Sequence, residues 1–334
     1  MNSEWQNFLC ELGVANITSD SLLAPGTMVS ALPDEVVLHV SGEDAESFLQ
    51  GQFSNDVAAL DDPGSQLTTW STPKGRVLAL FRLIRVGDHF LIRLPAALAE
   101  TFTRRLRMYV LRAKVVIEEQ NHLVSFGLAA EQLPATVDAL LGQLPSETDG
   151  CVVQGECCVV KVRGTVNRYE VTVPVTSAIE LWNQCASQAQ QGGEGHWRLQ
   201  NIDAGVPTVG SATSEAFVLQ MMNLQHIDGV SFKKGCFPGQ EVVARMQYLG
   251  KLKRRMYLLS GSADAGVPAP GDDLYTEGKS SAIGKVVDAQ PAGDGTYRML
   301  AVCAIEAMQQ PVYQEPEAKH RVTEIELPYS VNAA

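Results

Sequence analysis

Lys233-Lys234-Gly235-Cys236-Phe237-Pro238-Gly239-Gln240-Glu241 is the stretch of this sequence that says most about its fold and function. It places a cysteine beside two lysines and just before a segment predicted to be helical. The positive potential of lysines and of a helix N-terminus favours the thiolate, the form that acts as a nucleophile or metal ligand. Gly235 and Gly239 allow tight turns around it. A surface cysteine flanked by solvated lysines fits the same pattern, so local chemistry leaves both interpretations open.

Further motifs surround this stretch on both sides. After it come Val242 to Arg245 and Tyr248 to Arg254; before it come Phe48 to Gln52, Pro73 to Arg76, Trp197 to Pro207, Asn223 to Gln225 and Gly229 to Phe232; and Leu327 to Ser330 lies near the end. Together they resemble the motifs of the YgfZ family of folate-binding proteins. The resemblance covers nearly the whole chain and is most specific between Trp197 and Arg254.

The resemblance implies an α+β protein with aminomethyltransferase-like architecture. In that architecture two intertwined α+β units surround a central channel, and a C-terminal antiparallel β-barrel closes it. A length of 334 residues agrees, because it exceeds what a single hydrophobic core usually organises. We expect an N-terminal unit over residues 1–125, a second unit with the KGCFPGQE motif over 126–250, and the barrel over 251–334.

Turn residues and hydrophobic patterning predict the elements of the first unit. Val36 to Val40 is predicted to be a strand, after which Ser41 can cap a helix that runs to about Leu49. Val77 to Val86 and Phe90 to Leu94 predict a hairpin around Gly87-Asp88. Pro95 then begins a helix that ends near Val110.

The same signals continue through the second unit and the barrel. Cys157 to Lys161 and Tyr169 to Val173 are predicted strands, Thr176 can cap the next helix, and a helix from about His196 should stop at Gly205. Short strands separated by Gly, Pro and Asp turns then predict a small antiparallel barrel or sandwich. They are Met256 to Leu259, Leu274 to Thr276, Ile283 to Asp288, Tyr297 to Ala304 and Val322 to Leu327.

The resemblance assigns roles to the residues of the central motif. Cys236 is the functional thiol, and Lys234 raises its ionised fraction. Gly235 and Gly239 shape the loop, while Gln240, Glu241 and Arg245 orient it through hydrogen bonds and charge pairs. Attack on a folate-linked one-carbon group, transient ligation of iron or sulfur, and redox exchange all remain open as chemistry for the thiol.

Tetrahydrofolate is the cofactor that the resemblance implies. A pterin is flat and aromatic with a polar edge, so its site should offer an aromatic face and convergent polar groups, with Lys or Arg near the carboxylate tail. Trp197 matches the family's folate-contacting tryptophan, although from composition alone it reads as a core residue. The second folate-contacting tryptophan of the family falls at Val36, so this chain departs from the pattern there.

The implied function is that of an accessory factor that supports assembly or repair of iron-sulfur enzymes. Such enzymes include those that thiolate tRNA by radical chemistry, which links the factor indirectly to tRNA modification. Two alternatives are a folate-dependent aminomethyltransferase and a protein that binds tRNA directly. Glycine-cleavage enzymes carry an acidic residue in the strand after the paired glycine motif. The matching segment here, Gly75 to Phe81, has none, so we expect no aminomethyl transfer and no conventional turnover.

Charge and composition limit the classes of partner and ligand that this chain is expected to bind. A net charge of −12 and a pI near 5.0 weigh against general nucleic-acid binding. Two basic clusters, Arg104 to Lys114 and Lys251 to Arg255, could make a local RNA contact, but we interpret them as solvated faces or as groups for an anionic small molecule. The seven cysteines lack CxxC pairs, so we expect neither a disulfide framework nor a metal site. Without a membrane-length apolar run or a signal peptide, a cytoplasmic monomer is expected.

Overall fold

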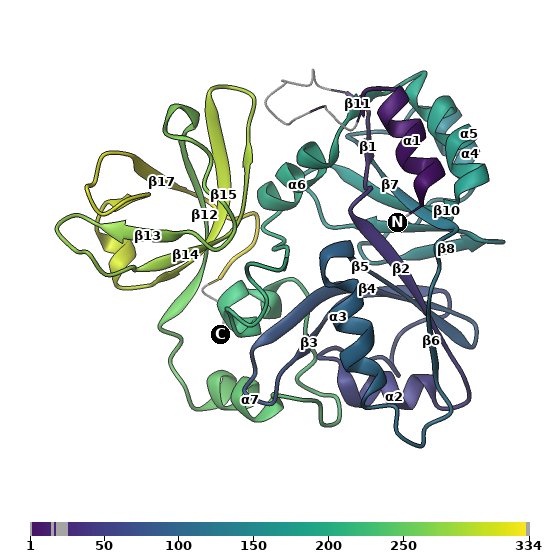
Figure 1. Ribbon diagram of the computed structural model, residues 1–334, viewed down its shortest axis with the longest axis horizontal. Coiled ribbons are helices and arrows are strands. Elements are labelled where there is room, and N and C mark those ends of the chain that lie inside the picture. Colours follow the sequence, from purple (N-terminus) through teal and green to yellow (C-terminus); the bar gives the residue numbers. More distant parts are fainter. Residues whose placement is uncertain (1, 15–16, 18–25, 332–334) are drawn as a thin grey trace.

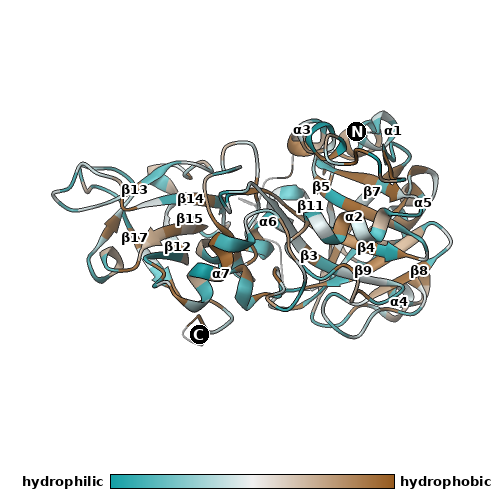
Figure 2. Cartoon of the chain, turned by 90° about the horizontal axis from the view of Figure 1, so that it is seen from below, coloured by the Kyte–Doolittle hydropathy of each residue, from teal (hydrophilic) through white to brown (hydrophobic). Residues whose placement is uncertain are grey.

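The computed structural model describes residues 2–14, 17 and 26–331. Figure 1 shows two neighbouring α+β units and, beside them, a C-terminal barrel. Figure 2 shows strands such as β5 and β7 as largely hydrophobic, whereas α7 carries many hydrophilic residues. No helix in this described part is long and apolar enough to cross a membrane.

The first unit is a five-stranded antiparallel sheet in the order β3-β4-β5-β2-β6. Its elements are β2 (Glu35–Ser41), β3 (Gly64–Ser71), β4 (Val77–Val86), β5 (His89–Pro95) and β6 (Val116–Glu119), with helices α2 (Ala45–Gln52) and α3 (Ala96–Arg107). The predicted hairpin is confirmed, because Val86 pairs with His89 across Gly87. Phe48, Leu98 and Phe102 bury the helices against this sheet.

The second unit is a six-stranded sheet in the order β11-β1-β7-β10-β9-β8. Its elements are β1 (Met28–Ala31), β7 (Leu123–Ala130), β8 (Cys151–Gln154), β9 (Cys157–Val162), β10 (Asn167–Pro174) and β11 (Gln190–Gly192), with helices α1 (Ser3–Glu11), α4 (Ala135–Leu141) and α5 (Val175–Ala186). Strand β1 pairs with β7, so Met28–Ala31 belong to this sheet and not to that of the first unit. The contiguous range 1–125 therefore does not describe the first unit, because the chain crosses between the sheets.

Two predicted helix caps are wrong. Ser41 is the last residue of β2, and α2 begins three residues later than this cap requires, after Asp44. Thr176 lies inside α5, whose N-cap is Pro174. In both α3 and α5 a proline ends the strand and directly precedes the helix. Its fixed φ sets the change of direction without a side-chain cap.

A closed barrel in the order β12-β15-β14-β13-β16-β17 ends the chain. Its strands are β12 (Arg254–Ser262), β13 (Asp273–Thr276), β14 (Gly284–Pro291), β15 (Thr296–Ala304), β16 (Val312–Tyr313) and β17 (Arg321–Ile325), with short 3-10 turns η4 (Ala263–Ala265) and η5 (Ala307–Gln309). The two-residue β16 was not predicted from the sequence, since so short a strand has no readable alternation. It completes the closure between β13 and β17.

The segment that joins the second sheet to the barrel contains α6 (Glu194–Asp203), η2 (Leu219–Met222), η3 (Leu224–His226) and α7 (Gln240–Tyr248). Helix α6 ends before Gly205, as predicted, and this glycine has a positive φ of 67°, which a residue without a side chain adopts at little cost. Ion pairs from Arg198 to Asp288 and from Asp203 to Arg298 fasten α6 to the barrel. This segment therefore connects all three parts.

Candidate functional site

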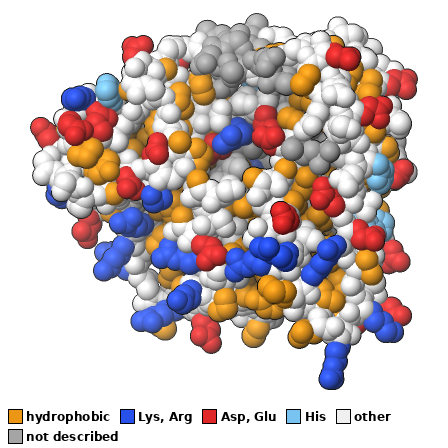
Figure 3. All heavy atoms as spheres, in the orientation of Figure 1, with side chains coloured by type: hydrophobic (Ala, Val, Ile, Leu, Met, Phe, Trp, Pro, Cys, Tyr) orange, Lys and Arg blue, Asp and Glu red, His pale blue; other side chains and the backbone are white. Residues whose placement is uncertain are grey.

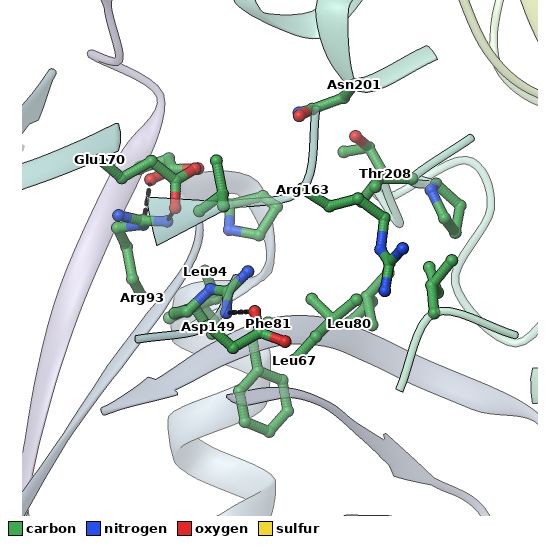
Figure 4. Close-up of a pocket in the computed structure, with 17 residues that line it drawn as sticks. Leu67, Leu80, Phe81, Arg93, Leu94, Asp149, Arg163, Glu170, Asn201 and Thr208 are labelled. Carbon is green, nitrogen blue, oxygen red and sulfur yellow. Dashed lines mark hydrogen bonds and ion pairs between the residues drawn. The ribbon is translucent and has the colours of Figure 1, made fainter. Parts of the chain in front are cut away.

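A cavity of about 100 Å³ lies where the two sheets meet. Its wall combines apolar side chains with buried charges from both sheets, as Figure 4 shows. It is lined by Glu35, Leu67, Leu80, Phe81, Arg82, Arg93, Leu94, Pro95, Asp149, Val162, Arg163, Glu170, Asn201, Val206, Pro207, Thr208 and Ile227. An apolar wall with a few convergent polar groups is typical of a small-molecule site, although most such pockets are larger.

Arg93 organises the charges on one side of this cavity. Its guanidinium pairs with Glu170 and lies 2.7 Å, from Nε to Oε2, from Glu35. Burial raises the pKa of Glu35 to about 7, against the opposing effect of Arg93. Burial also opposes ionisation of Glu170, but the cations Arg93 and Arg82 outweigh it and lower the pKa of Glu170. Glu170 is therefore the permanent anion here, and Glu35 changes charge near neutral pH.

Some hydrogen-bond donors and acceptors on this wall have no partner or can accept further hydrogen bonds. Arg93 Nη1 is buried and has no hydrogen-bond partner among the residues that the structure describes. Glu170 accepts from Arg93 and from Trp197 Nε1, which still leaves lone pairs on its two oxygens. An unmatched buried donor beside a carboxylate is costly unless a ligand or water completes it. The wall can thus offer one donor and one anionic acceptor to a ligand.

Two further arginines lie on the cavity wall. Arg82 pairs with Asp149, which joins β4 of the first sheet to the loop before β8 of the second. Arg163 lies on the side opposite Arg93 and Glu170 (Figure 4), where it pairs with Asp228 at 3.2 Å. The Asp228 side chain is 81% exposed, so this pair is weakly held. Arg163 is consequently the cation best placed to exchange its partner for an incoming anion.

Trp197 lies behind the cavity wall, not in it. Its side chain is buried, and a Cβ built on Gly127 would lie 2.5 Å from its ring. The guanidinium carbon of Arg168 is 3.9 Å from the ring centroid. Direct stacking of a pterin on Trp197 would require one of these groups to move. In this structure its connection to the cavity is the hydrogen bond to Glu170, and contact with folate stays a prediction.

Val36 is also absent from the cavity wall. It is a buried residue of the first unit's core, and its neighbour Glu35 faces the cavity instead. Successive residues of a strand point to opposite faces of the sheet, which explains the difference. The residue at this position therefore does not provide a contact to the cavity in this chain.

The Cys236 loop lies apart from the cavity lining. Cys236 is exposed, and its neighbour Lys234 is buried. Lys234 Nζ donates to the carbonyls of Gln50, Phe53 and Asn55 at 2.7, 2.7 and 2.8 Å. Burial lowers the pKa of Lys234 to about 8. All three of its donors are committed to carbonyls at the carboxyl end of α2, so this lysine anchors the loop, and its effect on the thiol stays a prediction.

The two loop glycines differ in what the fold demands of them. Gly239 has φ 85°, and a Cβ there would lie 2.7 Å from Gly75 Cα and from Thr72 O. Gly75 itself has φ 71°. The motif around Cys236 and the motif at Pro73 to Arg76, which are far apart in the sequence, are therefore in direct backbone contact. Gly235 has no atom within 4 Å of a built Cβ, so space does not require a glycine there, contrary to the prediction.

The predicted orienting residues make no such contacts. Glu241 and Arg245 are exposed and Gln240 is half-buried, and no side-chain hydrogen bond or ion pair joins any of them to another described residue. Packing does the positioning, through buried Val243 and through Gln220, which donates to the Val243 carbonyl at 2.6 Å. The described residues show no polar contact through which these three side chains would orient the loop, and that role stays a prediction.

Sequence reasoning missed the charged cavity wall. A signal for it exists: Arg82, Arg93 and Glu170 each interrupt an apolar strand, and a charge in such a strand is normally buried only with a partner. The partners cannot be read from the sequence. Among the described residues no cluster of three or more His, Cys, Asp or Glu could hold a metal ion. Cys151 and Cys158 Sγ lie 3.4 Å apart, with all described cysteines in the free form.

No protein-family model matches the chain. The glycine cleavage system aminomethyltransferase T from Bartonella henselae is similar in structure, with a TM-score of 0.72 over 91% of this chain and 86% of that one, at 15% sequence identity. The regulatory subunit of aspartate kinase from Thermus thermophilus covers 49% of this chain at a TM-score of 0.26 and 9% identity, too little to indicate a shared architecture. The chain has the aminomethyltransferase-like fold, with its C-terminal barrel, that the sequence motifs implied.

Proposed function

We propose that this chain is a tetrahydrofolate-binding accessory factor of the YgfZ type. It would hold folate in the cavity between the two sheets and use the exposed Cys236 to support iron-sulfur enzymes, including radical enzymes that thiolate tRNA. The proposal includes a cytoplasmic monomer. The observation that carries it is the buried, incompletely satisfied wall of Arg93 and Glu170 at the centre of an aminomethyltransferase-like fold.

The chemistry of this wall suits a pterin edge. A pterin presents adjacent N–H donors and a carbonyl acceptor. The free lone pairs of Glu170 can accept the former, and the unpartnered Arg93 Nη1 can donate to the latter. Phe81, Leu80 and Leu94 supply apolar surface for the rings. The cavity must widen, and displacement of Arg163 from exposed Asp228 would open it and free a cation for the glutamate tail.

Calorimetry with tetrahydrofolate tests the binding site. Glu170→Gln should weaken binding at least tenfold, because a charged hydrogen bond contributes about 1.5–3 kcal/mol. Arg163→Ala should weaken it severalfold, since Arg163 is not part of the pterin wall. Arg321→Ala, an exposed barrel residue, serves as the matched control and should bind as the native protein does. A native protein that shows no folate binding, or folded variants that bind unchanged, would remove the basis for the proposal.

Cys236 needs a separate test in cells. Cys236→Ser removes little volume but replaces a soft thiol with a hydroxyl, which is a poor nucleophile and metal ligand. Because the thiol is exposed, the variant should fold. In cells lacking the protein it should fail to restore thiolated tRNA and the activity of an iron-sulfur enzyme, whereas Cys10→Ser, at another exposed thiol, should restore both. Full rescue by Cys236→Ser would leave the cysteine without a functional role.

Aminomethyl transfer remains the second candidate because of the fold. Strand β4 carries no carboxylate, although Glu35, Asp149 and Glu170 bring three to the cavity from other elements. We expect no release of ammonia and methylenetetrahydrofolate from an aminomethylated carrier protein incubated with this chain. Robust release would reverse the order of the two candidates.

A further inference from the structure

Exposed apolar side chains gather at the carboxyl ends of two helices. The large ones are Met108, Tyr109 and Leu111 after α3, and Tyr248 and Leu249 at the end of α7. They make up five of the nine exposed large hydrophobic residues in the described chain. Leu111 and Leu249 are 88% and 87% exposed. Such side chains occur singly on many surfaces, but a concentration of them marks an interaction site.

The carboxyl end of α3 and the amino end of α7 flank one turn. The Tyr109 ring packs against Trp70, with centroids 5.9 Å apart, at the end of β3. The turn that follows, at Gly75, touches Gly239 at the start of α7. Residues 215 and 216 connect the same regions, because Glu215 pairs with Arg105 and the Ala216 carbonyl accepts from Arg76. The α3 end, the β3–β4 turn and α7 therefore form continuous protein surface.

Cations border this surface. On α3, the β3–β4 turn, α7 and the segments next to them, nine exposed cations that form no ion pair with another described residue are Lys74, Arg104, Arg107, Arg112, Lys233, Arg245, Lys251, Lys253 and Arg254. Figure 3 shows Lys and Arg side chains in a band across the lower half of the face seen in Figure 1, where α3 and α7 lie. We call these nine cations and the five apolar residues the α3–α7 surface. It is basic on a chain whose net charge is −12.

Cys236 opens onto this surface. It is exposed, and it lies between exposed Lys233 and Gly239 at the start of α7. Lys234 fixes the loop by its three carbonyl contacts, while Cys236 stays exposed. A partner seated on the α3–α7 surface would thus come within reach of the thiol.

We propose that the α3–α7 surface docks an acidic partner protein and presents it to Cys236. The inference rests on the proposed role of Cys236 and adds the chemistry of the partner. Complementary charge steers association, while apolar anchors at the centre of an interface provide affinity. Leucine and methionine side chains contribute little to a phosphate backbone, so a protein fits this surface better than RNA does.

Thiol–disulfide exchange at Cys236 measures docking directly. The probes are synthetic peptides with one cysteine blocked as the thionitrobenzoate disulfide: one rich in Glu and Leu, one in Lys and Leu, and one in Glu and Ser. The reaction rate of Cys236 itself is obtained by subtracting the rate measured with the Cys236→Ser variant from the rate measured with the native protein. The Glu/Leu peptide should react at least tenfold faster than the Lys/Leu peptide, and the ratio should fall between 0.05 and 0.5 M salt. The Glu/Ser peptide should be intermediate.

Substitutions on the α3–α7 surface show which residues cause the faster reaction of the Glu/Leu peptide. Lys251→Glu with Lys253→Glu should reduce the Glu/Leu rate about tenfold, and Leu111→Ser with Leu249→Ser should reduce it severalfold. Lys319→Glu with Arg321→Glu, a matched pair of exposed barrel cations, should not change it. Neutral dithiodipyridine should react equally with all folded variants, which separates docking from the intrinsic reactivity of the thiol.

Either of two outcomes overturns the docking inference. One is equal rates for the acidic and basic peptides. The other is tight, salt-dependent binding of a tRNA transcript that the Lys251/Lys253 reversal abolishes while the acidic peptide shows no preference. Failure of the proposed function is distinct, because full rescue of cells by Cys236→Ser would leave these rates unaffected.

Discussion

Lys234 stabilises a helix end 184 residues away in the chain through its contact with the Gln50 carbonyl. Its ammonium group satisfies three carbonyls, at Gln50, Phe53 and Asn55, where the backbone leaves helix α2. The last carbonyls of a helix have no intrahelical donor, so a cation there offsets their burial. A residue that looked catalytic beside its cysteine is therefore first a structural link between two motifs.

We expect Lys234→Met to lower the free energy of unfolding by about 2–4 kcal/mol, because it leaves buried carbonyls without donors. Urea denaturation measures the loss. Lys233→Met, at the exposed neighbouring position, is the control and should change stability by about 0.5 kcal/mol or less. Equal effects of the two substitutions would show that the three contacts contribute nothing. Alkylation of Cys236 in both variants then tests the predicted influence of each lysine on the thiol.

Trp197 is a packing residue that positions a cavity residue. Trp197→Ala should cost about 3–5 kcal/mol of stability, as expected for a buried large aromatic side chain. Trp197→Phe keeps an aromatic ring beneath Arg168 but removes the donor to Glu170, so it should cost about 1–2 kcal/mol. Thermal and urea unfolding measure both. A Trp197→Ala protein as stable as the native one would contradict the burial described here.

At the scale of elements, the contact between α7 and the β3–β4 turn positions the cysteine loop. It depends on two glycines, because Gly239 and Gly75 both have positive φ and approach closely. Helix α7 buries only Val243, so this contact adds to the packing of that residue and to the hydrogen bond from Gln220. Its position follows from this backbone contact more than from its own amphipathic pattern.

A matched pair of substitutions tests that contact. Gly239→Ala should destabilise the protein by about 2–4 kcal/mol, because a Cβ at φ 85° meets backbone atoms that cannot yield. Gly235→Ala should be neutral within about 0.5 kcal/mol, because nothing lies within 4 Å of its Cβ. Denaturation curves and limited proteolysis around residue 239 provide the comparison. Equal tolerance at both positions would mean that the turn and α7 do not pack as described.

At the scale of the whole molecule, burial of charge between the two sheets makes stability depend on pH. The pKa of Glu35 is about 7 in the folded protein, above its ordinary 4.5. The folded state binds more protons between these values, so this group's contribution to stability falls as pH rises from about 4.5 to 7.

We therefore expect Glu35→Gln to gain stability relative to the native protein over that range. The gain should be absent near pH 4.5 and reach on the order of 3 kcal/mol above pH 7, because the amide cannot ionise. Melting temperatures from pH 4.5 to 8 follow the difference. The exposed Glu317→Gln should show a constant offset. If the difference in melting temperature between Glu35→Gln and the native protein does not change with pH, then Glu35 is not the group whose ionisation makes stability depend on pH.

The sequence by itself determined the local elements and the fold class. The Gly87 hairpin, the strand–proline–helix junction at Pro95 and the end of α6 at Gly205 depend on φ preferences that a few neighbouring residues set. The motifs around Cys236 likewise implied the aminomethyltransferase-like architecture. Ser41 and Thr176 were misread because each can cap a helix, and the tertiary context chose other start points.

The tertiary structure alone decided which distant residues share a site. It placed β1 in the second sheet, paired Arg93 with Glu170 across the two units, and put Lys234 under the end of α2. These contacts join residues separated by 77 to 184 positions. Side-chain periodicity specifies only which face a residue occupies, whereas the partner on that face depends on how the sheets pack. Buried charges in apolar strands showed that partners must exist, and only the folded chain showed which ones.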